Sequence, residues 1–135
     1  MNDCLFCKII TGEIPSAKIY EDENSFAFLD INPTNTGHTL LVPKEHSRNI
    51  FDINKNTLKQ LMPPLQELSI AVKNGVGVSG VNIQINNEPT AGQVIFHTHI
   101  HIIPRFKDDK IKMWKGGKYK KGEIEELVKK IKKQL

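Results

Sequence analysis

Hydrophobic and polar residues alternate along several short stretches of the chain, and a period of two predicts β-strands. The clearest case is FHTHIHIIPR, residues 96–105, where His97, His99 and His101 alternate with apolar or small side chains. Side chains two positions apart lie on one face of a strand at intervals of about 6.7 Å. We therefore expect a row of three imidazoles on one face of this strand and a core on the other.

Four other segments have the composition of strands and are separated by turn-like sequences. They are KIYED at 18–22, SFAFLDI at 25–31, HTLLVP at 38–43 and VNIQIN at 81–86. The first two flank the turn EDEN and should form a hairpin. The last leads through NEPTAGQ to the histidine strand.

Apolar residues recur at helical spacing in two segments. The long one runs from about Asn54 to Lys73. Pro63 and Pro64 predict a break or kink within it, and Gly75 is expected to end it. The second, GEIEELVKKIKKQL at the C-terminus, has acids in its first turn and lysines in its last, as the helix dipole favours.

The chain has several predicted strands and few predicted helices, and the helices do not alternate with the strands. This pattern predicts an α+β fold. We expect an antiparallel sheet of about five strands, one main helix and a C-terminal helix. The length of 135 residues fits one domain, with a core at 1–106 and a basic loop and helix at 107–135. No apolar run is long enough to span a membrane. MNDCLFCKII lacks the features of a signal peptide, which predicts a cytoplasmic protein with reduced cysteines.

The net charge of +4 is unevenly distributed along the chain. Residues 107–135 hold eleven lysines and five acids, a balance of +6, which leaves −2 for the rest of the chain. Such a segment attracts nucleic acid or an anionic surface. The helical spacing of its apolar residues favours a simpler interpretation, an amphipathic helix with a solvated basic face.

Cys4 and Cys7 form a C-x-x-C pair, and His46 follows far along the chain. Reduced thiols at this spacing suit a tetrahedral zinc ion whose other ligands come from distant histidines. A redox-active pair is a second interpretation, although no thioredoxin-like βαβ pattern surrounds it. Two buried, unliganded thiols are a third. We favour zinc over both.

The sequence AGQ, residues 91–93, directly precedes the histidine row. Gly92 allows the backbone to approach a ligand closely, and Gln93 adds an amide donor, which are features that a phosphate needs. A glycine before a strand is by itself more often a simple turn. Three histidines in register, however, indicate a metal site or a phosphate site.

Together these segments resemble the histidine-triad (HIT) family of nucleotide-binding hydrolases and transferases. HTHIHII, residues 97–103, matches the pattern His-φ-His-φ-His-φ-φ, with Thr98 at one apolar position. CLFCKIITGEIPSAKIYEDENSFAFLDINPTNTGHTLLVPKEH is similar to the family's N-terminal half, and NNEPTAGQVIFHTHIHIIPR is similar to its catalytic segment. The resemblance implies a HIT-like fold and a homodimer with sheets joined edge to edge.

The resemblance also implies a mechanism, in which His99 attacks the α-phosphorus of a nucleotide and forms a nucleotidyl-histidine that water hydrolyses. His101 would protonate or orient the leaving group, with support from His38. The nucleophile needs an acceptor on its other nitrogen, for which the carbonyl of His97 is the candidate. Phosphate oxygens would be bound by Asn86, Gln93 and the backbone amides of residues 92 and 93.

FAFLDI resembles the family's base and ribose segment. By this resemblance Phe28 and Ile31 would flank a purine, and Asp30 would accept hydrogen bonds from the ribose hydroxyls. Leu5 and Phe6 match the other wall of that pocket.

The zinc-containing bacterial relatives imply a structural zinc. Its ligands would be Cys4, Cys7, His46 and His97. Val94 stands where some phosphoramidases carry a serine. The substrate is therefore open between nucleotide amidates and dinucleoside polyphosphates, and Val94 is counted among the nucleotide contacts.

Two other functions remain open on the sequence. In the first, His97, His99 and His101 hold a catalytic zinc whose bound water attacks the substrate. In the second, the zinc is structural and the basic tail binds nucleic acid without turnover. The AGQ loop and Asp30 argue against both. The expected partners are a purine nucleotide or its conjugate and a second copy of the chain, with neither a membrane nor nucleic acid.

Overall fold

The computed structural model describes residues 3–135. Its helices are α1 (Leu5–Ile10), α2 (Lys55–Val76) and α3 (Glu123–Lys132), with a short 3-10 turn, η1 (Pro89–Ala91). Its strands are β1 (Lys18–Glu21), β2 (Ser25–Leu29), β3 (Thr39–Pro43), β4 (Gly80–Gln84) and β5 (Ile100–Arg105). None of the helices in this part of the chain combines the length and the apolar character that crossing a membrane requires.

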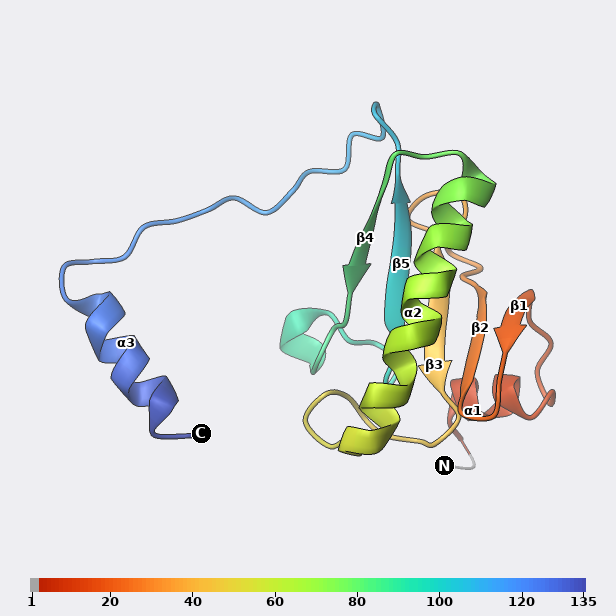
Figure 1. Cartoon of the computed structure of the whole chain (residues 1–135), viewed down its shortest axis with the longest axis horizontal. Helices are drawn as coiled ribbons and strands as arrows, with labels where there is room; N and C mark the ends of the chain where they lie inside the picture. The colour runs from red at the N-terminus through yellow and green to blue at the C-terminus, as the bar shows by residue number, and fades with distance from the viewer. Residues whose placement is uncertain (1–2) are drawn as a thin grey trace.

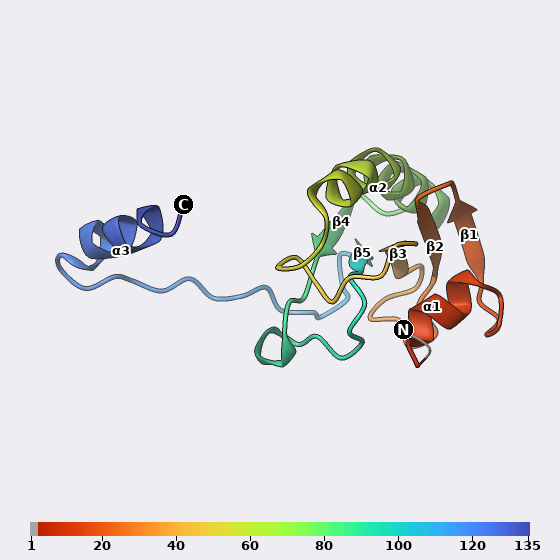
Figure 2. The same cartoon turned by 90° about the horizontal axis from the view of Figure 1, so that it is seen from below.

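The five strands form one antiparallel sheet in the order β1-β2-β3-β5-β4 (Figure 1). This confirms the predicted α+β fold and the β1–β2 hairpin. β5 lies between β3 and β4, so the histidine segment enters the middle of the sheet. α2 covers one face of the sheet, and α1 lies on the other side (Figure 2).

Each face of the sheet carries an apolar cluster. The cluster under α2 contains Ala27, Leu41, Leu61, Leu68, Val72, Ile100 and Ile102. The cluster near α1 contains Phe6, Ile9, Phe26, Phe28, Leu40 and Val42. Neighbouring strand residues such as Ala27 and Phe28 belong to opposite clusters because side chains alternate between the faces. Phe6 and Ile9, one turn apart, attach α1 to the sheet, and burying each of them contributes roughly 1.5–3 kcal/mol.

α2 runs without a break through Pro63 and Pro64, and it ends at Gly77 in the left-handed conformation rather than at the predicted Gly75. The two prolines remove the N–H donors that would bond the carbonyls one turn earlier. Pro64 is itself buried, together with Leu61, Leu68 and Val72 of the same helix face. Packing of this face on the sheet therefore keeps the helix continuous, since tertiary contacts supply most helical stability in proteins.

β5 begins four residues later than the predicted strand 96–105. Residues 96–99 are therefore not part of the strand. Pro43 of β3 lies beside His97 and has no N–H to donate to β-sheet hydrogen bonding. The N–H of Thr98 instead donates to the carbonyl of Ser47 at 2.8 Å. Phe96, which was predicted to face the core, is 39% exposed. The alternation of imidazole and core residues thus begins after Phe96.

The predicted C-terminal helix is present as α3. A segment without regular structure, residues 107–121, leads to it. Both views show α3 standing apart from the rest of the chain (Figures 1 and 2). Each apolar residue of α3 is at least 36% exposed: Ile124, Leu127, Val128 and Ile131. The amphipathic pattern is therefore real, but its apolar face is not covered by residues 3–121.

Candidate active site and metal centre

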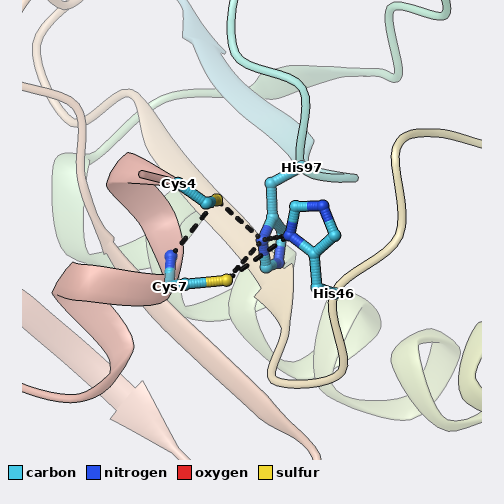
Figure 3. A group of neighbouring side chains, drawn as sticks. All are labelled: Cys4, Cys7, His46 and His97. Atoms are coloured by element: carbon cyan, nitrogen blue, oxygen red, sulfur yellow. Dashed lines mark hydrogen bonds between the residues drawn. The ribbon is translucent and has the colours of Figure 1, made fainter. Parts of the chain in front are cut away.

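The four predicted zinc ligands point toward one another beside the start of β5 (Figure 3). Nδ1 of His97 lies 3.4 Å from Sγ of Cys4, 3.5 Å from Sγ of Cys7 and 3.1 Å from Nδ1 of His46. Ligand atoms around a tetrahedral zinc, with bonds of about 2.0–2.3 Å, are separated by about 3.3–3.8 Å. The cluster therefore has the size and chemistry of a closed four-ligand zinc site.

Local structure orients these ligands. Cys4 is the N-cap of α1 and Cys7 lies in its first turn, so both sulfurs project from one end of the helix. Nε2 of His97 donates to the carbonyl of Pro43 at 2.8 Å, which leaves the lone pair of Nδ1 directed at the sulfurs. Burial, reinforced by the hydrogen bond with Cys4, raises the pKa of the Cys7 thiol to about 11. A cation is therefore needed to hold the Cys7 sulfur as a thiolate at neutral pH.

His99 lies two residues further on and has the opposite tautomer. Its Nδ1 lies 2.6 Å from the carbonyl of His97, the acceptor expected from the sequence, so Nδ1 carries the proton and donates it. Nε2 then keeps its lone pair. The side chain is 6% exposed, and burial lowers its pKa. His99 is therefore a neutral imidazole whose free nitrogen is Nε2.

His38 and His101 form a hydrogen-bonded pair beside His99. Nδ1 of His38 accepts from the backbone N–H of Thr34 at 3.0 Å, so its Nε2–H donates to Nδ1 of His101 at 2.9 Å. The proton of His101 therefore sits on Nε2, which is buried and has no partner among residues 3–135. Burial lowers both pKa values, that of His101 to about 4. Asp30 lies 3.8 Å from Nε2 of the neutral His38, too far for a hydrogen bond.

A pocket of about 470 Å³ opens beside these imidazoles, and this volume is typical of small-molecule sites. Ten of the eleven predicted nucleotide contacts line it: Leu5, Phe6, Phe28, Asp30, Ile31, Asn86, Gly92, Val94, His99 and His101. The sequence did not single out several further lining residues, including Ser16 and Asn32. The wall near α1 and β2 is mostly apolar, whereas the imidazoles and Asn86 are polar. The pocket is therefore suited to a ligand with one apolar and one polar or charged part.

Comparison with known proteins identifies the family. The sequence model of the HIT domain family matches residues 11–108, which make up most of the chain. The chain belongs to the HIT domain family. The matched range contains the three alternating histidines, His97, His99 and His101.

Solved and curated HIT proteins resemble this chain over most of its length. SMU.412c from Streptococcus mutans UA159 is 41% identical, with a TM-score of 0.95 over 99% of this chain and 86% of that one. A zinc-bound histidine triad family protein from Mycobacterium smegmatis is 31% identical, with a TM-score of 0.78 over 99% of both chains. Adenylylsulfatase HINT3 from Arabidopsis thaliana is 44% identical over 108 residues, which are 80% of this chain and 55% of that protein.

In this HIT domain Gln93, which was predicted to bind phosphate oxygens, is not among the residues that line the pocket. Its amide nitrogen donates to the carbonyls of Arg48 and Ile95 at 2.6 and 3.1 Å. Its oxygen accepts from the side chain of Asn49 at 3.0 Å and from the N–H of Glu88 at 2.8 Å. Both ends of the amide are occupied within the protein and the residue is 3% exposed, so Gln93 orders the loop.

The predicted backbone donors of the same HIT loop are also occupied. Gly92 N–H donates to the carbonyl of Pro89 at 2.9 Å, and Gln93 N–H donates to that of Glu88 at 3.2 Å. The following amide, that of Val94, has no acceptor in the described part of the chain. Gly92 has a φ of 87°, which closes this turn and favours glycine. The turn therefore leaves the Val94 amide as its free donor beside the pocket.

An ion pair that braces the HIT loop was missed from the sequence. Arg48 donates to both carboxylate oxygens of Glu88 at 2.8 Å, and Asn49 donates to one of them at 2.8 Å. The guanidinium of Arg48 is the main cause of the low pKa of Glu88, about 2. Glu88 has a φ of 75°, a conformation that non-glycine residues adopt only when their surroundings hold it. Arg48 and Glu88 are 40 positions apart, so no local pattern reveals the pair.

Proposed function

We propose that this chain hydrolyses a purine nucleotide conjugate at its α-phosphate, through a covalent intermediate on His99. The observation that carries the proposal is the tautomer of His99: Nδ1 is committed to the carbonyl of His97, and Nε2 is left as a neutral nucleophile beside a pocket. A fixed tautomer and a depressed pKa are what an imidazole nucleophile requires at neutral pH.

The reaction proceeds in two displacements. The lone pair of His99 Nε2 forms a bond to the α-phosphorus, and the bond to the leaving group breaks, with its electron pair departing on the leaving atom. Water then attacks the phosphorus, the P–N bond breaks, and its electrons return to His99 Nε2. The products are the free leaving group and a nucleoside monophosphate. The carbonyl of His97 supports the positive charge that builds on the imidazole in the first step.

His101 assists through its Nε2–H, which donates a hydrogen bond to the leaving atom or to a phosphate oxygen as negative charge develops there. The chain of donors from Thr34 through His38 fixes this proton on Nε2 and therefore fixes the direction of donation. The buried, unpartnered Nε2 supports this role, because an unsatisfied buried donor costs free energy until a ligand accepts from it.

The nucleoside would occupy the apolar part of the pocket. Phe28 and Ile31 lie on its wall and offer flat or branched surfaces to a purine, with Leu5 on another wall. One carboxylate oxygen of Asp30 accepts from the N–H of Asn32 at 2.8 Å, which leaves the other for the ribose hydroxyls. The amide of Val94 and the side chain of Asn86 are the proposed contacts to the phosphate oxygens.

The leaving group is open to three chemical classes. Nucleotide amidates and dinucleoside polyphosphates fit the resemblance described above, and the name of the HINT3 relative adds an adenylyl sulfate. Val94 has no hydroxyl that would contact a leaving group and is 78% exposed. We therefore expect little selection for an amine leaving group at this position.

We further propose that Cys4, Cys7, His46 and His97 hold a structural zinc. The fit of the four donor atoms and the zinc-bound relative support this assignment. Four protein ligands leave no open position for water or substrate, and the ion would tether α1 to the catalytic segment. A catalytic zinc on His97, His99 and His101 is disfavoured because His97 directs its lone pair at the sulfurs and His99 directs its lone pair toward the pocket.

The test is to trap the intermediate. The protein is mixed in separate reactions with adenosine phosphoramidate, diadenosine polyphosphate or adenylyl sulfate. Each reaction is quenched within one turnover, and the mass of the intact protein is measured by mass spectrometry. We expect the mass of one adenylyl group on His99 with at least one substrate, and none in His99→Gly. Turnover of a substrate without an adduct in any of the three reactions would contradict the covalent mechanism.

A further inference from the structure

Glu88 has a backbone conformation that its residue type disfavours. Its φ is 75° and its ψ is 158°, a combination that is found almost exclusively at glycine. Its surroundings therefore have to hold it in this conformation. Glu88 directly precedes η1, the turn that leads to the free amide of Val94 beside the pocket. The strain thus lies at the start of residues 88–94, the loop to which the proposed function assigns the phosphate.

The backbone of Glu88 sets the course of this loop. Its carbonyl accepts from the N–H of Ala91 at 3.0 Å and from the N–H of Gln93 at 3.2 Å. Its own N–H donates to the side-chain oxygen of Gln93 at 2.8 Å. A rotation of the backbone at Glu88 would therefore move the acceptor on which the turn closes, and the amide of Val94 would move with it.

Two residues from a distant segment hold the carboxylate of Glu88, and this pair is called the clasp below. Arg48 donates from Nε to one carboxylate oxygen and from Nη2 to the other, both at 2.8 Å. Asn49, which is 1% exposed, donates from Nδ2 at 2.8 Å. Asp52 fixes the clasp in turn, because its carboxylate accepts from the backbone N–H groups of both residues at 3.0 and 2.9 Å. Both views show the segment that precedes α2 beside η1 (Figures 1 and 2).

Arg48 also contacts the chain on the far side of the loop. Its carbonyl accepts from Nε2 of Gln93 at 2.6 Å. Its guanidinium lies over the ring of Phe96, with Cζ 4.1 Å from the ring centroid, in a cation–π contact. Arg48 therefore holds the chain at Glu88, before the turn, and at Phe96, after it. The amide of Val94 lies between these two points.

The exposure of the pair separates this role from a contribution to overall stability. The side chains of Arg48 and Glu88 are 46% and 39% exposed. Ion pairs on the surface contribute little to the free energy of unfolding. A clasp on a strained residue has a different effect, because the backbone keeps its course only while the carboxylate is held. Loss of the clasp should therefore move the loop without unfolding the chain.

We propose that Arg48 and Glu88 are positioning residues for the proposed hydrolysis, and that the clasp keeps the Val94 amide directed at the oxygens of the α-phosphate. The inference rests on the proposed function, which assigns this amide to the phosphate. Neither Arg48 nor Glu88 lines the pocket, so both act through the backbone of the loop. A donor that is held in place before the reaction stabilises the developing charge without reorganisation, which lowers the barrier.

The experiment compares Arg48→Met with Lys18→Met. The first variant removes the guanidinium and keeps an unbranched apolar chain over Phe96. The control removes a cation of similar exposure, 54%, which pairs with Glu21 at 3.0 Å and lies 5.8 Å from the centroid of a phenylalanine ring, but on β1. We expect kcat of Arg48→Met to fall by about 10–100-fold with KM changed by less than about threefold. The control should keep the wild-type kcat, and both variants should keep their zinc and their melting temperature.

A binding measurement decides the inference separately from catalysis. ¹⁵N spectra record the amide of Val94 before and after saturation with AMP, and hydrogen exchange at the amide of Gln93 reports its bond to Glu88. We expect the AMP-induced shift at Val94 to be much smaller in Arg48→Met than in the wild type, and exchange at Gln93 to be about 10-fold faster or more. Lys18→Met should match the wild type in both. Neither quantity needs turnover, so chains that do not form the covalent intermediate still give a result.

A double-mutant cycle tests whether the two residues act as a unit. Glu88→Gly allows a positive φ without strain but offers Arg48 no carboxylate. Adding Arg48→Met to Glu88→Gly should cause no further change in the shift at Val94 or in exchange at Gln93. Additive effects would overturn the inference, as would a wild-type shift and wild-type exchange in Arg48→Met, or a wild-type amide of Val94 that does not respond to AMP. If Arg48→Met does not fold, Glu88→Gly decides alone, and wild-type values in that variant would overturn the inference.

Discussion

His97 and His99 are two residues apart in one extended segment, yet they belong to sites of different kinds. His97 donates from Nε2 to the carbonyl of Pro43 and turns Nδ1 to two sulfurs. His99 donates from Nδ1 to the carbonyl of His97 and turns Nε2 to the pocket. The residue type is identical, so the backbone acceptor that each ring finds decides whether it suits a metal or a phosphorus atom.

The two sites also differ in whether their polar groups are satisfied. In the metal cluster each donor atom lies close to the others, and four protein ligands close the site. In the pocket, Nε2 of His101 is buried without a partner in residues 3–135, and the Val94 amide is free in the same region. Under the proposed function, the first arrangement contributes to stability through its zinc, and the second is completed by the bound ligand.

The largest expected effect separates the two sites directly. His99→Gly removes the nucleophile, and we expect kcat to fall by about 10⁴-fold or more, as for other covalent nucleophiles. Zinc content and the melting temperature should remain close to those of the wild type because His99 is not among the four clustered ligands. Steady-state rates, elemental analysis and a thermal melt measure all three. Loss of zinc in this variant would show that the two sites are one.

The converse change acts on the metal cluster. Cys4→Ser weakens zinc binding, and we expect a fall in melting temperature of roughly 10 °C or more, because metal binding couples to folding. Activity should fall only as far as the segment around His97 loosens. Treating the wild type with a chelator should reproduce the same melting temperature. If Cys4→Ser kept its zinc and its melting temperature, the structural assignment would be wrong.

A smaller effect is expected in the donor chain behind His101. His38→Gln removes the imidazole that fixes the proton of His101 on Nε2. We expect kcat to fall by about 10–100-fold, while nucleotide affinity and zinc content change little. Ser47→Ala is a suitable control, since its hydroxyl is equally buried but bonds Thr98 away from the pocket, at 2.6 Å. An unchanged kcat in His38→Gln would exclude the donor chain from the mechanism.

The smallest expected effect is the response to pH. Burial, with the neighbouring imidazoles, lowers the pKa of His101 from its ordinary value of 6.5 to about 4. Between these values the unfolded chain takes up a proton that the folded chain does not, so this group's contribution to stability is present above pH 6.5 and is lost as pH falls toward 4. Protonation of His101 on Nδ1 also removes the acceptor of the hydrogen bond from His38 Nε2.

Because of this shift, kcat should stay level from pH 8 to about 5.5 and fall only below it. Rates and urea unfolding measured at the same pH values test both statements. A decline in kcat centred near pH 6.5 would show that one of the three imidazoles of the site, His38, His99 or His101, titrates without the expected lowering of its pKa.

The chemistry of the sequence made much of the molecule predictable. HTHIHII and the C-x-x-C pair predicted residues that the structure brings together in the pocket and in the Cys/His cluster. Alternation predicted segments that overlap all five strands. The spacing of apolar residues in EIEELVKKIKKQL gave the C-terminal helix. These features depend on neighbours within a few positions, which a linear pattern records.

Three-dimensional packing decided the rest. Pro64 stays helical because it is buried against the sheet, and Gln93 serves the loop because Asn49 and the carbonyl of Arg48 meet its amide. The acceptor of His97 is 54 positions away in the chain. The sequence by itself determined which imidazoles and thiols are available for the proposed chemistry. Only the tertiary structure decided which nitrogen of each imidazole is free, because that choice depends on hydrogen-bond partners that are distant in sequence and become neighbours only on folding.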